Sequence, residues 1–360
     1  MKKYLFLCLI FAGFSSSFLY AQAPKYSNEF MAIGVGGRSL GMSNSCVASI
    51  SDVTAGYWNP AGLLGIKNDM QVGLMHSEYF AGIAKYDYGA LARKLDSTSA
   101  FAISFIRFGV DNIPNTTELI DAAGNVDYDK ITQFSAADYA FVISYARTPS
   151  KIKGLKLGGN AKIIRRVVGD FAGAWGFGLD AAAQYEHKGW KFGAMARDIS
   201  TTFNAWSYSL TDEMKDVFAT TGNEIPVNSI EITLPRLIVG AAKQIDLMKD
   251  LTLMAEINTD MTFDGKRNVL IKGEPISLDP HLGLEFGYKN MVFLRGGVMN
   301  IQKEQQVTGK EVTTLQTNFG VGIKIKRISI DYAKTDIGDN SVALYSHIVS
   351  LRLDINRQPK

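Results

Sequence analysis

The sequence predicts an all-β protein, a transmembrane antiparallel β-barrel of about fourteen strands, and three observations lead to this fold class. Apolar residues alternate with polar or small residues at period two along most of the chain after residue 68. The alternating segments run for about ten residues, which is the length that a tilted strand needs to cross a bilayer. Short connections between these segments alternate strictly with longer ones. Because lipid cannot hydrogen-bond an open sheet edge, such a sheet has to close on itself.

The first 23 residues have the pattern of a secretory signal peptide. Lys2 and Lys3 form a basic start, residues 4–14 are an apolar run, and the small residues Ala21 and Ala23 mark a cleavage site. We therefore expect the mature chain to leave the cytoplasm. No later run reaches the length of about 18 apolar residues that would predict a transmembrane helix.

The composition excludes several classes of protein. Charged residues make up 20% of the chain and apolar residues 46%, which excludes a disordered chain as well as a bundle of membrane helices. The formal net charge of +3 includes Lys2 and Lys3 of the signal peptide, so no nucleic-acid partner is expected. Cys46 is the single cysteine after the signal peptide, so no internal disulfide is expected.

Residues 24–68, which we call the hatch segment, are rich in glycine and precede the first alternating segment. Asn59-Pro60 is a turn signal, because the residue before a proline avoids the helical region, and Trp58 places a large amphipathic side chain before that turn. We expect the segment to fold into the barrel mouth and to plug the lumen; the alternative is an ordinary linker that contains a turn. The candidate hatch residues are Gly37, Arg38, Gly41, Trp58, Asn59, Pro60, Ala61 and Gly62.

Residues 69–360 are expected to form the barrel. Strands are predicted to begin near Met70, Lys85, Ala100, Asp138, Leu155, Gly173, Trp190, Arg236, Leu251, His281, Met291, Thr317, Ile328 and His347. Connections such as Lys289-Asn290 and Lys326-Arg327 are short, whereas residues 109–136 and 200–235 are predicted to be long loops. This alternation is typical of bacterial outer-membrane barrels, whose short turns and both chain ends face the periplasm. The alternative from the pattern alone is a soluble sandwich or propeller, whose strands are usually shorter.

Ionisable side chains interrupt the polar rows of the predicted strands. In a barrel these rows face the lumen, where water or mutual pairing offsets the cost of burying a charge. We interpret them as a salt-bridge lattice that stiffens the wall, with a substrate path as the alternative. The residues are Lys85, Asp87, Lys162, Asp180, Glu256, Glu285, Arg295, Lys324, Asp331, Arg352 and Asp354.

Motifs for catalysis and metal binding match only formally. Residues 37–41 fit the G-x-S-x-G pattern of a nucleophile elbow, but no central strand precedes them and the four histidines lie in separate segments. The same glycines lack the lysine of a phosphate-binding loop. Asp121, Asp127 and Asp129 cluster in a predicted surface loop, but their spacing misses that of a calcium-binding loop. We therefore predict that the protein is not an enzyme and uses no metal or cofactor.

Three stretches of the hatch segment, residues 36–42, 49–52 and 57–63, resemble the N-terminal signature of the FadL-like (fatty-acid-transporter) barrel superfamily. Residues 26–31 and 109–125 are similar to the PorV/PorQ branch of that superfamily, which belongs to the type IX secretion system. The resemblance implies a fourteen-stranded barrel with an internal hatch and a role that is not catalytic. For a PorV-like member it implies that cargo proteins are bound by their C-terminal signal domains and passed to an attachment complex at the cell surface. For a PorQ-like member it implies that the barrel anchors another surface component of that complex, and the choice between the two roles stays open.

On this resemblance we expect an outer-membrane component of the type IX secretion system. Its expected partners are the C-terminal domains of secreted cargo, surface attachment-complex or translocon proteins, and the lipid of the outer membrane. Aromatic residues among polar ones suit a protein interface, although a loop of this kind can also pack on the barrel rim. The candidate partner-binding residues in the two long loops are Phe203, Trp206, Tyr208, Phe218, Ile113 and Pro114.

The alternative function is passive transport of hydrophobic small molecules such as long-chain fatty acids. A transporter of this kind needs an apolar pocket under the hatch and a lateral opening, which a strand kink or bulge often provides. Gly158-Gly159 and Gly296-Gly297 are the candidate kink sites, although glycine also fits a tight barrel wall.

Overall fold

The computed structural model of the chain describes residues 27–80, 82–116, 119, 124–305, 309–336 and 345–356. The predicted signal peptide lies outside these residues, as do Asp121 and the first residues of the hatch segment. Among the described residues no helix has the length and apolar character needed to cross a membrane.

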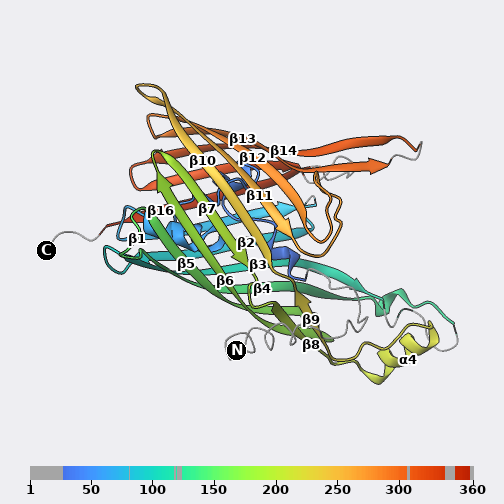
Figure 1. Cartoon of the computed structure of the whole chain (residues 1–360). Coiled ribbons are helices and arrows are strands. Elements are labelled where there is room, and N and C mark those ends of the chain that lie inside the picture. The colour runs from blue at the N-terminus through green and yellow to red at the C-terminus, as the bar shows by residue number, and fades with distance from the viewer. Residues whose placement is uncertain are drawn as a thin grey trace, which may run out of the picture.

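One antiparallel sheet forms the wall of the molecule (Figure 1). Its strands are β1 (Met70–Tyr79), β2 (Ala84–Lys94), β3 (Ser99–Asn115), β4 (Thr132–Arg147), β5 (Leu155–Val168), β6 (Ala172–His187), β7 (Trp190–Arg197), β8 (Thr202–Tyr208), β9 (Ser229–Thr233), β10 (Arg236–Met248), β11 (Leu251–Thr262), β12 (Ser277–Tyr288), β13 (Val292–Gln305), β14 (Glu311–Ile325), β15 (Ile328–Asp336) and β16 (Tyr345–Ile355). The helical elements are η1 (Glu29–Met31), α2 (Gly37–Gly41), α3 (Ala55–Trp58), η2 (Pro60–Gly65), η3 (Tyr128–Lys130) and α4 (Asp212–Thr220).

The sheet closes into a barrel because its strand pairings run around a full circle, through β1–β16 and β5–β6. β1 pairs with β16 from Met70↔Ile355 onward, and β5 pairs with β6 as well as with β4. β7 and β8 lie end to end along β6, and their partners β10 and β9 form a second interrupted strand. The sixteen segments therefore make a wall of fourteen strands, which confirms the predicted fold class.

The outer face of the barrel is apolar, as the period-two pattern predicts. Along β6 the side chains of Trp175, Phe177 and Leu179 are exposed, while the residues between them face inward. β14 repeats the pattern with Phe319, Val321 and Ile323. A water-soluble protein does not expose large apolar rows of this kind on strand after strand, whereas lipid covers them at no cost. The surface is that of a barrel that spans a membrane.

The two predicted long loops are largely regular structure, which corrects the sequence analysis. β3 runs to Asn115 and β4 begins at Thr132, so both ends of residues 109–136 continue the β3–β4 hairpin. Residues 200–235 contain β8, α4 and β9, and the two strands belong to the barrel wall. Both hairpins project from one end of the barrel, which we call the long-hairpin end; the other is the short-turn end (Figure 1). The alternation of apolar and polar residues weakens at the long-hairpin end, because a strand that extends beyond the bilayer need not keep one apolar face.

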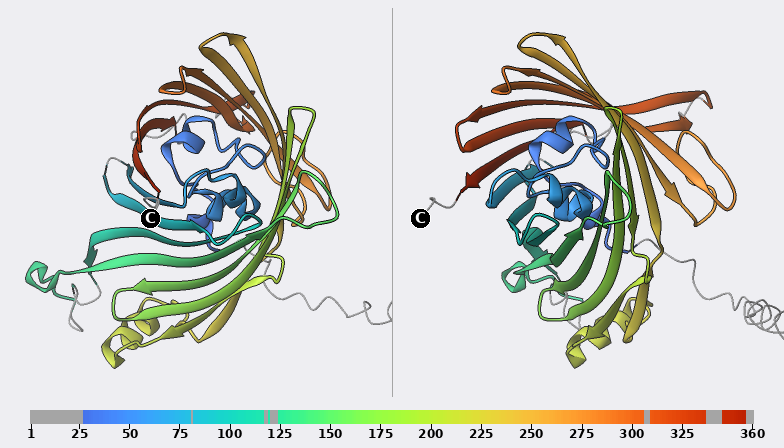
Figure 2. Two further views of the ribbon diagram at one scale, coloured as in Figure 1. Left: turned by 90° about the vertical axis from the view of Figure 1, so that its left-hand side faces the viewer. Right: turned by 60° about the vertical axis from the view of Figure 1, so that its left-hand side comes forward.

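Residues 27–68 of the hatch segment lie inside the barrel, surrounded by strands in the view along its axis (Figure 2, left). Their apolar side chains pack against the inner faces of β1 to β5, where Tyr57, Trp58 and Leu63 join a buried cluster with Tyr86 and Ile106. These strands thus carry apolar side chains on both faces. Lys85 and Asp87, which we predicted to face the lumen, lie on the outer face of β2 instead, since Tyr86 and Tyr88 take the inner positions.

Candidate functional site

A row of ion pairs joins the hatch segment to the wall on the side of β12 to β16. Arg38 of α2 donates to both carboxylate oxygens of Glu285, at 2.9 and 3.1 Å. Arg295 contacts the same carboxylate at 2.6 Å and Asp331 at 2.6 Å. All four side chains are largely buried, so each charge is stabilised by its partners and not by bulk water. The predicted salt-bridge residues therefore reach the hatch segment as well as one another.

A second ion pair forms between Asp52 of the hatch segment and Arg352 of β16, whose Nη1 lies 2.6 Å from Asp52 Oδ2. Thr54 adds two hydrogen bonds to the other oxygen of Asp52, from its backbone N–H at 2.9 Å and its hydroxyl at 2.6 Å. Burial alone would raise the pKa of Asp52, but Arg352 and Thr54 together hold it below its ordinary value. Asp52 is therefore ionised at neutral pH.

Asn59, one of the predicted hatch residues, anchors the segment to β6. Its Nδ2 donates to the carbonyls of Val47 at 2.9 Å and Ala183 at 3.1 Å. Its Oδ1 accepts from the N–H of Ala61 at 3.1 Å and so caps η2, with Pro60 in the first turn. The turn signal in the sequence is thus a helix start that is bonded to the wall.

Glycines allow the hatch backbone to lie directly on the wall. A Cβ at Gly41 would lie 2.9 Å from the Cα of Gly320, and one at Gly297 would lie 2.7 Å from the carbonyl carbon of Met42. A Cβ at Gly158 would lie still closer to the backbone of Ala61. Strand register is regular through Gly158-Gly159 and Gly296-Gly297, so neither pair is a β-bulge, and the close contacts of Gly158 and Gly297 fit the alternative that glycine serves a tight barrel wall. The wall is instead interrupted between β7 and β8, at residues 198–201.

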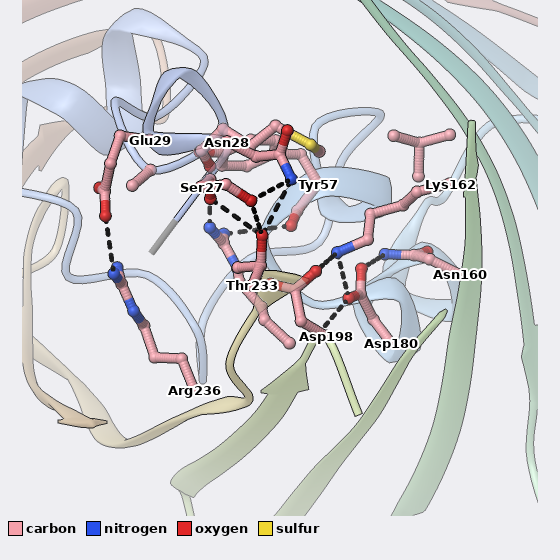
Figure 3. A pocket seen from close by; sticks show the side chains of 14 residues that line it. Ser27, Asn28, Glu29, Tyr57, Asn160, Lys162, Asp180, Asp198, Thr233 and Arg236 are labelled. Atoms are coloured by element: carbon pink, nitrogen blue, oxygen red, sulfur yellow. Dashed lines mark hydrogen bonds and ion pairs between the residues drawn. The ribbon is translucent and has the colours of Figure 1, made fainter. Parts of the chain in front are cut away.

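A small pocket of about 40 Å³, lined mostly by polar and charged residues, lies at this interruption (Figure 3). Lys162 of β5 points between two carboxylates, Asp180 at 2.7 Å and Asp198 at 2.5 Å, and Asn160 donates to Asp180 at 3.0 Å. Asp198 has a positive φ of 57°. We missed Asp198 because nothing in the local pattern marks the end of β7. The cluster ties the end of β7 to β5 and β6.

A larger cavity of about 240 Å³ lies between the hatch segment and the wall at the long-hairpin end. Its lining is mostly apolar, with Phe80 at a positive φ of 54° in the turn after β1. The lining residues are Ala32, Ile33, Leu40, Asn44, Tyr79, Phe80, Phe108, Met299, Gln316, Asn318 and Thr335. None of these residues was predicted as a site, because they come from eight separate stretches of chain and are brought together only by closure of the barrel.

A third cavity, of about 270 Å³, lies toward the short-turn end and is lined mainly by charged and polar residues. Arg38, Asp52 and Lys324 are among them. This cavity shares no lining residue with the apolar one. The hatch segment contributes to the walls of both, so the lumen has an apolar compartment and a polar compartment.

The predicted partner-binding residues do not form one surface. Phe203 is exposed on the outer face of β8, whereas Trp206 points the other way, donates to Glu231 at 3.1 Å and lies under the guanidinium of Arg166. Tyr208 stacks on Trp206, and Phe218 is half-buried in α4. Ile113 and Pro114 belong to β3 and pair with Phe134 and Gln133 of β4. The period-two geometry of β8 separates the aromatic residues that the sequence placed together.

The described part of the chain includes Ser39 and Cys46 of the hatch segment and the predicted loop residues Asp127 and Asp129. It contains no group of three histidine, cysteine, aspartate or glutamate side chains placed to hold a metal ion. Ser39 of the G-x-S-x-G match is buried in α2, and no base is hydrogen-bonded to it among the described residues. Burial raises the pKa of the Cys46 thiol, which keeps it neutral.

Comparison with known proteins identifies the fold. No protein-family model and no curated protein matches the chain. Among solved structures the chain is similar to the Pseudomonas putida toluene transporter TodX, with 13% identity, a TM-score of 0.57, and coverage of 89% of this chain and 98% of TodX. The CymD monoaromatic hydrocarbon channel is 12% identical with a TM-score of 0.54, over 90% of this chain and 98% of CymD. The Ralstonia pickettii toluene transporter TbuX is 12% identical with a TM-score of 0.51, over 90% of this chain and 99% of TbuX.

These similarities show that the chain has the fold of outer-membrane transport barrels, and they support the FadL-like resemblance at the level of the fold. They give no support for the PorV/PorQ branch or for type IX secretion, which stay predictions.

Proposed function

We propose that the protein is a passive outer-membrane transporter of hydrophobic small molecules, with the apolar cavity at the long-hairpin end as its binding site. This was our alternative reading of the sequence, and it now has the better support. The observation that carries it is a cavity of about 240 Å³ with a mostly apolar lining inside a barrel of this fold. Pockets of this kind, with few polar groups, are typical of small-molecule sites.

The size of the cavity favours a compact ligand. An engineered apolar cavity of about 150 Å³ binds benzene, so a cavity of about 240 Å³ accommodates one substituted ring. A long acyl chain would extend beyond it. The proposed substrates are therefore molecules of about one aromatic ring.

Uptake by whole cells tests the proposal. Cells with the protein are expected to take up labelled toluene faster than cells without it, and Ile33→Trp is expected to reduce the rate because the indole fills the cavity. Leu74→Trp is the matched control, since Leu74 is exposed on the outer face of β1. Equal uptake with and without the protein would contradict the proposal.

A second candidate function, binding of partner proteins at the cell surface as in type IX secretion, is favoured by the long hairpins. Val227, just before β9, is 74% exposed, and Ile230, within β9, is 73% exposed. Tyr128 of η3 is 74% exposed. Deleting residues 209–228 removes α4 and leaves β8 and β9 in the wall. Loss of co-purifying proteins with unchanged heat-modifiable migration would support this function, and unchanged co-purification would exclude α4 as the docking element.

A further inference from the structure

The short turns of the barrel carry a band of exposed basic side chains, which we call the basic rim. It lies at the short-turn end and runs from the turn between β4 and β5 to the turn between β14 and β15, so it follows most of the circumference of the wall. Its members are Lys151, Lys153, Lys188, Lys249, Lys289, Lys326 and Arg327.

The charges of the basic rim are not neutralised within the protein. Among the described residues, no carboxylate lies within ion-pair distance of a rim side chain. The opposite end of the barrel differs, because the connection of residues 209–228 contains four acidic residues and one basic residue. Solubility requires only a surface of mixed charge at each end and does not explain this separation. The basic rim therefore indicates an anionic partner at the short-turn end.

The basic rim lies directly beside the apolar surface that contacts lipid. Exposed apolar residues next to rim residues in the chain are Ile152, Met248 and Ile325. The ammonium group of Lys289 lies 5.3 Å from the ring centre of Tyr288. The ammonium group of Lys243, on the outer face of β10, lies 4.8 Å from the ring centre of Trp190. Tyrosine and tryptophan are enriched where hydrocarbon meets the lipid headgroups, and lysine extends its charged end toward that level.

We propose that the basic rim binds the headgroups of anionic phospholipids, such as phosphatidylglycerol, in the leaflet that surrounds the short-turn end. The phosphate oxygens accept hydrogen bonds from the ammonium groups of the rim, while the acyl chains cover the apolar rows beside them. The inference is independent of the transported molecule, because no rim residue lines the apolar cavity.

Electron spin resonance of spin-labelled lipids tests the inference on the full chain folded in phosphatidylcholine vesicles. The spectrum separates lipid in contact with the barrel from bulk lipid, and the ratio of association constants for labelled phosphatidylglycerol and labelled phosphatidylcholine measures the preference. One basic group near the membrane surface attracts an anionic lipid about fivefold, and averaging over the whole perimeter in both leaflets lowers the expected ratio to about two. Raising the NaCl concentration to about 1 M shortens the screening length to about 3 Å and is expected to bring the ratio to about one.

The test variant replaces every lysine of the basic rim with glutamine. The matched control replaces an equal number of exposed lysines at the long-hairpin end with glutamine, namely Lys130, Lys215, Lys266, Lys272, Lys303 and Lys310. The preference is expected to fall toward one in the test variant and to persist in the control, with heat-modifiable migration showing that both are folded. A ratio of one in the wild-type chain, a ratio that does not change with salt, or equal ratios in the two variants would overturn the inference. The salt titration uses the wild-type chain and so decides the question even where the test variant does not fold.

Discussion

Replacing Gly297 with alanine probes how tightly the hatch segment lies on the barrel wall, and its neighbour Gly296 provides the control. A Cβ at Gly297 would lie 2.6 Å from the carbonyl oxygen of Leu282, and 2.7 and 2.8 Å from the carbonyl carbon and oxygen of Met42. All three atoms belong to the backbone, so no side chain can rotate away. A Cβ at Gly296 would meet its nearest neighbour only at 3.9 Å.

The two substitutions are therefore expected to have opposite effects on stability. Overpacking of this kind costs about 1–3 kcal/mol, so Gly297→Ala lowers the free energy of unfolding. Gly296→Ala meets no obstacle and is expected to raise it by about 0.4–1 kcal/mol, because alanine restricts the unfolded chain. The difference between the variants is then about 1.4–4 kcal/mol.

Two measurements check this expectation on protein folded in lipid vesicles. Urea unfolding followed by tryptophan fluorescence gives the free energies of unfolding. Maleimide labelling of Cys46 reports on the hatch segment itself, since the thiol is fully buried there and burial raises its pKa. Gly297→Ala is expected to label faster than wild type and Gly296→Ala at the wild-type rate. Equal stability and equal labelling of the two variants would refute the close packing of hatch segment and wall.

Three further predictions concern the polar contacts of the hatch segment and the strand interruption. Asp52→Asn is expected to lower the free energy of unfolding at pH 7 by about 1–3 kcal/mol, because Arg352 loses the carboxylate that lies closest to it. The pKa of Asp52 is depressed in the folded state. The stability that the Asp52 carboxylate contributes is therefore present above the unfolded pKa of about 3.9 and is lost as the pH falls below that value. In urea titrations, the difference in unfolding free energy between wild type and variant should be smaller at pH 3 than at pH 7. Asn59→Ala removes a helix cap and two hydrogen bonds, and a loss of about 2–3 kcal/mol in the same assay is expected; a loss below about 0.5 kcal/mol would contradict the anchoring role. Asp198→Asn leaves Lys162 with one carboxylate and should destabilise the barrel by about 1–3 kcal/mol, and unchanged unfolding would show that the cluster does not hold the interruption together.

Strand positions could be predicted from the sequence because alternation is a local property. Strands begin at Met70, Leu155, Trp190, Arg236 and Leu251, as predicted. The larger errors occur at the long-hairpin end, where β4 begins at Thr132 and β14 at Glu311. Those residues lie past the bilayer, where neither face has to be apolar and the signal weakens.

Other features depend on contacts between residues far apart in the chain. The predicted lumen residues Glu285, Arg295, Asp331 and Arg352 do face inward, but their bonds to Arg38 and Asp52 exist only because the hatch segment lies among them. The apolar cavity likewise exists only because the hatch segment lies inside the barrel wall.

The sequence by itself determined the fold class, the strand number and which connections are short, since these follow from residue type and spacing along one chain. The tertiary structure alone decided which face of β2 is inward, where the wall is interrupted and what lines the cavities. Period two distinguishes two faces of a strand without saying which one meets lipid. For β1 to β5 that choice is made by the apolar side chains of residues 27–68, which turn the inner wall into part of a core.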